Sequence, residues 1–419
     1  MMKCIENPRR SLAVLTLLSS LTLTACALSP SGKNPPANYS VDDSTGVITV
    51  TGTNGETITG RVLSNFDKPW AMTFLPDGRA LVTEKAGVIW LVNSDGSKAG
   101  QINNGPAVTA RGQGGLGDII IHPGFGGNGL GRGVVYLSYV ERDPSDDELN
   151  GAVVERAVLD LNSDGGELNA RQIIWSQSPK VTGNGHYSHR LVFSDDGHLF
   201  ITSGERQKFS PSQNMAMNLG KIIRVDEDGI APTSNPFYGN GAVADQIWSL
   251  GHRNVLGIDF DAKGQLWAHE MGPKGGDELN RIVRAENYGY PVVSDGQHYS
   301  GKPFNSHESN PVYENPALSW TPVISPSGFV IYDGDRFESW AGNGLIGGLS
   351  AKALLRVAFE EAPLDNTGAP PSTDTTETIA REVARYSWDK RIREVEQGPD
   401  GSVLVLEDGE DARLITFEP

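Results

Sequence analysis

The sequence predicts an all-β fold, because a hairpin-like unit recurs along it. Each unit has an apolar residue, a turn that contains glycine, and then alternating residues of strand type. Clear copies occupy residues 74–84 (FLPDGRALVTE), 193–205 (FSDDGHLFITSGE), 260–270 (FDAKGQLWAHE) and 397–408 (QGPDGSVLVLED), and a degenerate relative with a longer loop spans 121–140. Such units at irregular spacing indicate the blades of a β-propeller with inserted loops.

The composition supports this fold class. The chain has 50 glycines and 25 prolines among 419 residues, and almost no segment keeps apolar residues at a spacing of three and four. These features argue against helix bundles and against alternating strands and helices. A six-bladed propeller over residues 46–419 fits the length, and seven blades or a pair of sandwiches stay open as alternatives.

Residues 1–25 have the pattern of an export signal. Basic residues precede an apolar stretch, Ser11 to Leu23, that is too short for a stable membrane anchor. The stretch leads into Leu23-Thr24-Ala25-Cys26, which is similar to the lipobox of bacterial lipoproteins. We therefore expect cleavage before Cys26, lipidation of its thiol, and a lipid-anchored protein that faces the periplasm. An ordinary secretory peptide is the alternative.

The segment after the signal is expected to be a flexible tether. Residues 26–45 are rich in Ser, Pro, Asn and Gly, a composition that cannot bury a core. The only other cysteine, Cys4, leaves with the signal, so disulfide, thiolate-metal and cysteine-nucleophile chemistry are excluded in the mature chain. The net charge of −17 argues against nucleic acid as a partner and makes any cluster of arginines a candidate ligand site.

A glycine-rich segment, residues 112–117, matches the dinucleotide pattern G-x-G-x-x-G. That pattern needs a following helix to direct its amides at a pyrophosphate. Here a strand-like run that ends at Pro123 follows instead, so dinucleotide binding is rejected. The glycines are expected to let the backbone approach a flat ligand, with Gln113 free to hydrogen-bond it.

Two histidines, His186 and His189, follow a glycine-rich turn. Their spacing could suggest zinc, but the segment reads as a strand entrance and lacks the helical geometry of a zinc pair. A neutral imidazole at His186 can accept a hydroxyl proton near neutral pH, which makes this residue a candidate general base. A surface histidine on a flexible turn is the alternative.

Arg391 and Arg393 alternate with Ile392, so on a strand both guanidinium groups point to one face. Two like charges on one face indicate an anionic ligand, although solvated strand arginines would explain the pair if it stood alone. Together with Arg253 and Gln113, the pair favours a polyanion.

Residues 251–280 combine a cationic turn at Arg253 with a turn at Gly272 and Pro273. Turns project side chains and free carbonyls, so Arg253 can face an anion while the carbonyls of Gly272 and Pro273 face a hard cation. Glu278 and the Tyr288 carbonyl could reach a second cation. Oxygen ligands of this kind suit Ca²⁺.

Several ordered motifs resemble those of the glucose/sorbosone dehydrogenase family, and more narrowly those of soluble aldose sugar dehydrogenases that use pyrroloquinoline quinone (PQQ). They are RGQGGLGDI, GHYSHRLVF, GHRNVLGIDF, GPKGGDELN, NYGYP, HYSG, SPSGFVIY and RIREV. The resemblance runs from about Leu63 to the C-terminus. It implies a six-bladed propeller with the quinone at one end of its central channel, and oxidation of an aldose at its anomeric carbon by hydride transfer.

The resemblance also implies a role for each motif residue. His186 would be the base and Arg253 would stabilise the developing oxyanion. The Gly272 and Pro273 carbonyls would bind the catalytic Ca²⁺, and Glu278 with the Tyr288 carbonyl would bind a structural Ca²⁺. The expected quinone contacts are Gln113, Arg253, Asn254, Tyr299, Arg391 and Arg393.

Two positions depart from the family pattern. Ser350 stands where some relatives have a lysine, and His189 replaces a glycine, which is expected to narrow the entrance. The expected partners are an aldose and an unidentified electron acceptor. A Ca²⁺-dependent lactonase, or a non-catalytic lipoprotein that binds glycans or a partner, are the competing functions.

Overall fold

The computed structural model describes residues 37–42, 44–126, 132–363 and 376–419. All of them belong to one unit, Asn34–Pro419. Strands dominate, so the predicted all-β class is confirmed. The helices within these ranges are single 3₁₀ turns, η1 (Ser210–Gln213), η2 (Ala244–Gln246), η3 (His307–Ser309) and η4 (Glu338–Trp340). None of the helices among the described residues is long and apolar enough to cross a membrane.

Three sheets are simple four-stranded antiparallel meanders. The first contains β12 (Ser188–Phe193), β13 (Leu199–Ser203), β14 (Lys221–Val225) and β15 (Ile247–Leu250). The second contains β16 (Val255–Phe260), β17 (Leu266–Glu270), β18 (Asp277–Ile282) and β19 (Leu318–Trp320). The third contains β20 (Pro326–Ile331), β21 (Gly344–Gly348), β22 (Ala353–Pro363) and β23 (Thr376–Ser387).

An eight-stranded sheet consists of two meanders that meet at one edge. One runs through β4 (Pro69–Phe74), β5 (Ala80–Glu84), β6 (Val88–Val92) and β7 (Lys98–Asn103). The other runs through β8 (Leu116–Ile121), β9 (Arg132–Asp143), β10 (Asp146–Asn162) and β11 (Gly165–Ser176). Only two residue pairs join β7 to β11, and they are parallel, whereas all other pairs in this sheet are antiparallel.

The remaining sheet joins the two ends of the described chain. Its order is β1-β2-β3-β26-β25-β24, so N-terminal strand β3 pairs with C-terminal strand β26. The strands are β1 (Tyr39–Asp42), β2 (Val47–Thr51), β3 (Thr57–Phe66), β24 (Ile392–Gln397), β25 (Val403–Glu407) and β26 (Ala412–Glu418). Strand β1 lies inside residues 26–45, the range predicted as a tether, so regular structure begins before residue 46.

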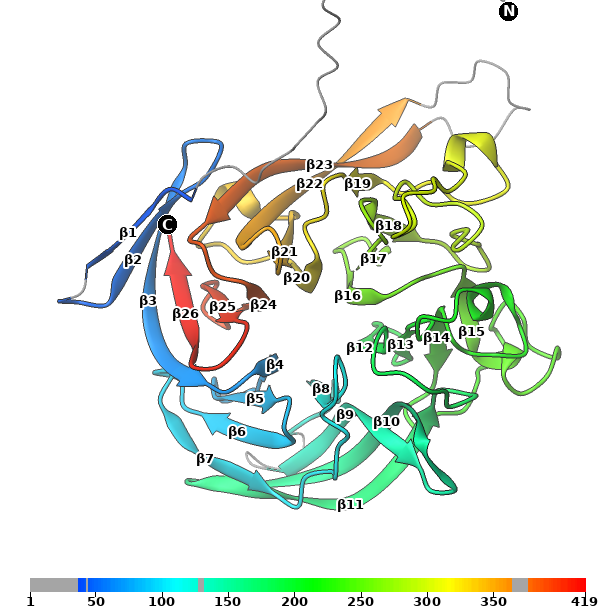
Figure 1. Ribbon diagram of the computed structural model, residues 1–419. Coiled ribbons are helices and arrows are strands. Elements are labelled where there is room, and N and C mark those ends of the chain that lie inside the picture. The colour runs from blue at the N-terminus through cyan, green and yellow to red at the C-terminus, as the bar shows by residue number, and fades with distance from the viewer. Residues whose placement is uncertain (1–36, 43, 127–131, 364–375) are drawn as a thin grey trace, which may run out of the picture. The chain divides into compact units, whose positions relative to one another are not determined.

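The first strands of the meanders form a closed series. Strands β4, β8, β12, β16, β20 and β24 contact one another in that order, and β24 contacts β4 (Figure 1). The recurring sequence units mark where each first strand turns into the second: residues 74, 193, 260 and 397 end β4, β12, β16 and β24. The sequence units therefore located the same hairpin in four places.

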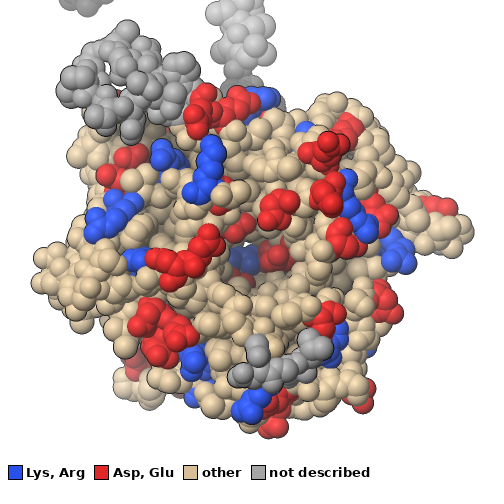
Figure 2. All heavy atoms as spheres, turned by 180° about the vertical axis from the view of Figure 1, so that it is seen from behind, with Lys and Arg blue, Asp and Glu red and all other residues tan. Residues whose placement is uncertain are grey.

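The apolar core lies between adjacent sheets. One cluster packs Trp267 and Leu279 against Phe329, Ile346 and Leu355 of the following sheet. Acidic side chains lie around a central hollow on the face in Figure 2, in keeping with the negative charge of the chain. A cavity lined by Arg391 and Arg393, in contrast, carries positive charge.

Candidate functional site

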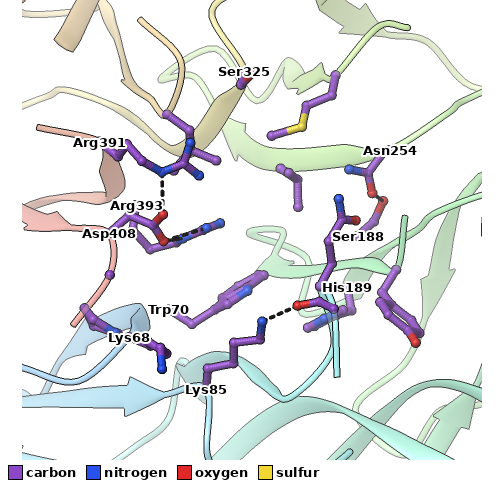
Figure 3. Close-up of a pocket in the computed structure, with 18 residues that line it drawn as sticks. Lys68, Trp70, Lys85, Ser188, His189, Asn254, Ser325, Arg391, Arg393 and Asp408 are labelled. Carbon is purple, nitrogen blue, oxygen red and sulfur yellow. Dashed lines mark hydrogen bonds and ion pairs between the residues drawn. The ribbon is translucent and has the colours of Figure 1, made fainter. Parts of the chain in front are cut away.

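A cavity of about 470 Å³ lies where the first strands and the turns beside them converge (Figure 3). Four cationic side chains line it, together with one carboxylate and one indole. They are Lys68, Lys85, Arg391, Arg393, Asp408 and Trp70. Such a lining suits a flat anion.

Four of the residues predicted to bind a quinone line this cavity, namely Gln113, Asn254, Arg391 and Arg393. Arg253 is the neighbour of Asn254 in the chain, and its side chain is buried beside the cavity. Tyr299 is 77 % exposed and is not one of the cavity-lining residues.

Arg391 and Arg393 share one carboxylate. Arg391 Nε lies 2.7 Å from Asp408 Oδ2, and Arg393 Nη2 lies 2.7 Å from Asp408 Oδ1. Asp408 therefore holds both guanidinium groups at the cavity wall (Figure 3) while neutralising only one of the two charges.

His186 lies behind the cavity wall and is only 7 % exposed. Its backbone N–H donates to Gln113 Oε1 at 2.6 Å, so the two predicted residues are in direct contact. Its Nδ1 lies 2.5 Å from Glu205 Oε1. Burial lowers the pKa of His186, which outweighs the hydrogen bond to Glu205, so the ring is neutral near neutral pH.

Glu205 was not predicted from the sequence. Burial acts to raise the pKa of this carboxyl, but the hydrogen bond from His186 and a bond from the backbone of Phe209 hold it below its ordinary value. An ionised carboxylate can only accept a hydrogen bond, so the ring proton of neutral His186 lies on Nδ1. Nε2 is then the nitrogen that can accept a proton. This pair has the arrangement expected of an oriented general base.

Two turns of strained backbone meet at this base. His186, Ser188 and His189 all have positive φ, at 51°, 59° and 63°, and Arg206 and Phe209 have φ of 60° and 63°. Non-glycine residues in this region cost of the order of 1–3 kcal/mol each and persist where surrounding contacts fix them. The strain therefore points to a tertiary constraint at the site.

A buried arginine braces the same turn. Arg206 is 1 % exposed and donates to the carbonyl oxygens of Gly183 (2.6 Å) and Gly185 (3.0 Å). It also donates to the Asn150 carbonyl at 2.7 Å and stacks over the Tyr187 ring at 3.8 Å. Arg206 thus ties the His186 turn to strand β10 of the neighbouring sheet.

The glycine-rich segment 112–117 packs closely against other segments of the site. A Cβ on Gly112 would lie 2.3 Å from the Asn184 carbonyl oxygen, and one on Gly115 would lie 2.3 Å from the Lys85 carbonyl oxygen. A Cβ on Gly117 would lie 1.9 Å from the His189 ring. These glycines therefore allow close packing of the protein's own segments. Gly112 and Gln113 also line the cavity, so close approach of a ligand to this backbone stays a prediction.

His189 forms part of the cavity wall and is 2 % exposed. Its ring stacks on Trp70 with 5.0 Å between centroids, and its Nδ1 lies 2.7 Å from Ser138 Oγ. Burial, and then the charge of Arg190, lower the pKa of His189 to about 3. The guanidinium of Arg190 lies 4.2 Å from the Trp70 ring centroid.

Arg253 lies against the turn at Gly272 and Pro273, whose carbonyls were predicted to bind a cation. Its Nη1 donates to the carbonyl oxygens of Met271 and Gly272, both at 2.8 Å, and its backbone N–H donates to Glu270. Its Nε is buried and has no hydrogen-bond partner among the residues that the structure describes. Pro273 is buried next to this contact.

The second predicted cation site is a buried group of oxygen atoms. Glu278 is 7 % exposed, and burial followed by the charge of Glu270 raises its pKa to about 8. Asn280 Nδ2 lies 3.5 Å from Glu278 Oε2, while Asn280 Oδ1 is buried and has no hydrogen-bond partner within the described part of the chain. The Tyr288 carbonyl faces His307 Nε2 at 3.3 Å.

Within the described residues, no three His, Cys, Asp or Glu side chains are grouped to hold a metal ion. Most of the ligands predicted for Ca²⁺ are backbone carbonyl oxygens, and a group of acidic, histidine or cysteine side chains would not include them. Cys26 and the export signal lie outside the described residues. Ser350 donates to the Val323 carbonyl at 3.1 Å.

Comparisons with known proteins bear on this site. The family model for glucose/sorbosone dehydrogenase matches residues 66–416. An aldose sugar dehydrogenase of Escherichia coli (strain K12) is 31 % identical over 359 residues, covering 84 % of this chain and 90 % of that protein.

Solved structures agree with the family match. The apo-form of the soluble aldose sugar dehydrogenase from Escherichia coli has a TM-score of 0.75 and 31 % identity, covering 86 % of this chain and 99 % of the other. The PQQ-bound form of aldose sugar dehydrogenase from Streptomyces coelicolor has a TM-score of 0.64 and 25 % identity, covering 92 % of this chain and 99 % of the other. The resemblance seen in the motifs is confirmed, and the chain belongs to the glucose/sorbosone dehydrogenase family of sugar oxidoreductases.

Proposed function

We propose that this chain oxidises aldoses at the anomeric carbon with PQQ and Ca²⁺ as cofactors. One observation carries the proposal: a cationic cavity lies directly against a buried, neutral His186 that Glu205 orients. The PQQ-bound relative from Streptomyces coelicolor supports the choice of cofactor.

The residues of the cavity fit a quinone that carries three carboxylates. Arg391 and Arg393 would bind carboxylate, and the amides of Gln113 and Asn254 would bind the polar edge of the ring system. Trp70 provides a flat apolar wall. Tyr299 stays a proposed contact on the resemblance of its motif.

The predicted calcium sites fit to different degrees. Around Glu278, a buried carboxylate and the unpartnered Asn280 Oδ1 are hard oxygen donors of the kind Ca²⁺ prefers. The Gly272 carbonyl already accepts a hydrogen bond from Arg253, so a cation there would use its second lone pair and the Pro273 carbonyl.

The protein's own residues would act as follows. His186 Nε2 would accept the proton of the anomeric hydroxyl, because Glu205 keeps the ring proton on Nδ1. The guanidinium of Arg253 would stabilise negative charge that develops on the sugar oxygen. When bound, the quinone supplies the hydride acceptor and Ca²⁺ polarises its carbonyl.

We also propose that the six first strands belong to six blades, with the eight-stranded sheet counted as two. The export signal and Cys26 lead us to propose a lipid-anchored periplasmic protein. Cys26→Ser should move the protein from the detergent phase to the aqueous phase, and continued membrane fractionation of that variant would refute the lipidation.

Reconstitution tests the function. Purified protein is mixed with PQQ and Ca²⁺ and supplied with aldoses and an electron-acceptor dye, and we expect dye reduction that needs both cofactors. A lactonase would instead hydrolyse sugar lactones without quinone, and a non-catalytic lipoprotein would do neither. Failure to reduce dye with any aldose, despite bound quinone, would refute the proposal.

A further inference from the structure

Lys85 reaches into the cavity from the turn that follows β5 (Figure 3). Its ammonium donates to the Gly112 carbonyl. A Cβ on Gly115 would lie 2.6 Å from Lys85 Cγ, so the lysine stem passes close over a glycine that has no side chain. Both ends of the lysine side chain are therefore held in place before any ligand binds.

The charge of Lys85 has weaker compensation than that of the other cations in the cavity. Lys68 pairs with Glu410 at 2.9 Å, and both arginines pair with Asp408. Within the described residues, no carboxylate lies within ion-pair distance of Lys85. Burial, and then the positive charge of Arg393, lower the pKa of Lys85, and the negative charge of Asp408 offsets this only in part.

The cavity carries a net positive formal charge. Lys68, Lys85, Arg391 and Arg393, against Asp408 and the Glu410 that pairs with Lys68, leave +2. Lys85 supplies one of those two units, and a tricarboxylate has the opposite sign of charge.

We propose that Lys85 binds a carboxylate of the quinone, as a cofactor-binding residue beside the Arg391 and Arg393 pair. This inference rests on the proposed function, because the anion is the quinone of that reaction. Ammonium and carboxylate form a charge-assisted bond, and a lysine already held by Gly112 loses little conformational freedom when that bond forms.

The test is quinone binding without sugar, so that it does not depend on turnover. The dissociation constant of PQQ is measured by fluorescence titration for the wild type, Lys85→Met and Lys85→Arg. Lys263→Met is the matched control, because Lys263 is a surface lysine with a 79 % exposed side chain. Circular dichroism and melting temperature show whether each variant is folded.

We expect Lys85→Met to bind PQQ about ten- to a hundredfold more weakly, with Lys85→Arg and Lys263→Met within a few fold of the wild type. The salt dependence of binding should also become shallower in Lys85→Met, which a purely structural role would not cause. Equal affinity of wild type and folded Lys85→Met would overturn the inference, as would an equal loss in Lys263→Met. A wild type that does not bind PQQ would overturn the proposed function itself.

Discussion

Replacing Glu205 with glutamine tests how the fold prepares His186 to accept a proton. The carboxylate lies 2.5 Å from His186 Nδ1 and keeps the ring proton there. A glutamine amide can donate to Nδ1 instead, which moves the ring proton to Nε2 and removes the acceptor. General-base catalysis is typically worth about 10²- to 10⁴-fold, so we expect quinone reduction by sugar to fall by that factor.

The same substitution has a second, smaller effect. Glu205 also accepts hydrogen bonds from the backbone N–H groups of Gln207 at 2.9 Å and Phe209 at 2.6 Å. Hydrogen bonds to a charged group are worth about 1.5–3 kcal/mol, and a neutral amide weakens them. We therefore expect a lower melting temperature for Glu205→Gln, and the rate must be measured well below it.

The assay is single-turnover quinone reduction with quinone bound and Ca²⁺ saturating, which separates chemistry from binding. Glu205→Asp keeps the charge and should retain more activity than Glu205→Gln. His186→Gln should lose the same step, and adding Glu205→Gln to it should cost little more, because both act through one ring. A folded, quinone-loaded Glu205→Gln that reduces quinone at the wild-type rate would refute the role of this pair.

Three further predictions follow from other parts of the site. The double variant Arg391→Ala/Arg393→Ala should lose PQQ affinity by tenfold or more, since charge-assisted bonds are worth about 1.5–3 kcal/mol each; unchanged affinity in the titration would return both arginines to a surface role. Burial lowers the pKa of His189 to about 3, so the unfolded chain binds a proton that the folded chain excludes. Stability should therefore fall as the pH drops below 6.5, by about 2–3 kcal/mol between pH 8 and 4.5 through this one residue. Between these two pH values, denaturant unfolding should show a loss of unfolding free energy that is smaller in His189→Gln than in the wild type by that amount. The same pH dependence of stability in both proteins would contradict this prediction. Chelation of Ca²⁺ should lower the melting temperature of the wild type more than that of Glu278→Gln, which would have only the ion at Gly272 and Pro273 to lose, whereas an equal drop in both would place the structural ion elsewhere.

The sequence predicted the hairpins well because their signal is local. A turn with glycine between alternating strand residues locates the loop between the first and second strands at 74–84, 193–205, 260–270 and 397–408. The corresponding loop between β20 and β21 is long and contains η4, so the pattern did not reveal it. The pairing of β3 with β26 joins residues more than 340 positions apart, and no local pattern reports such a contact.

The same contrast between local and long-range contacts applies to the site residues. Arg393 lies in β24 and Arg391 comes directly before that strand, so their spacing alone placed both near one ligand, and the structure brings them to the cavity wall. Lys85, Arg206 and Trp70 come from other sheets and turns, and their relation to the cavity depends on how the sheets meet. Residues that act across sheets therefore needed the structure.

One signal for Glu205 was nevertheless present in the sequence. The four units each carry a glutamate at the end of the second strand or, for Glu205, just beyond it, and Glu84, Glu205, Glu270 and Glu407 are all buried. Each accepts a hydrogen bond from the segment that precedes the first strand of its own sheet, through Asp67 N, His186 Nδ1, Arg253 N and Trp388 Nε1 respectively. The repeated carboxylate is thus a structural feature that fixes how the chain enters each sheet. The residue that precedes β12 in this contact is His186, which has a positive φ and lies beside the cationic cavity. Its hydrogen bond to Glu205 therefore also sets the tautomer of the proposed general base. The segment that enters β16 also places an imidazole on its glutamate, since His252 Nδ1 lies 3.0 Å from Glu270 Oε1, but the Nε2 of that fully buried ring lies 2.8 Å from Ser249 Oγ. The recurring structural contact has become part of the proposed catalytic site at β12, where the His186 ring lies beside the cationic cavity.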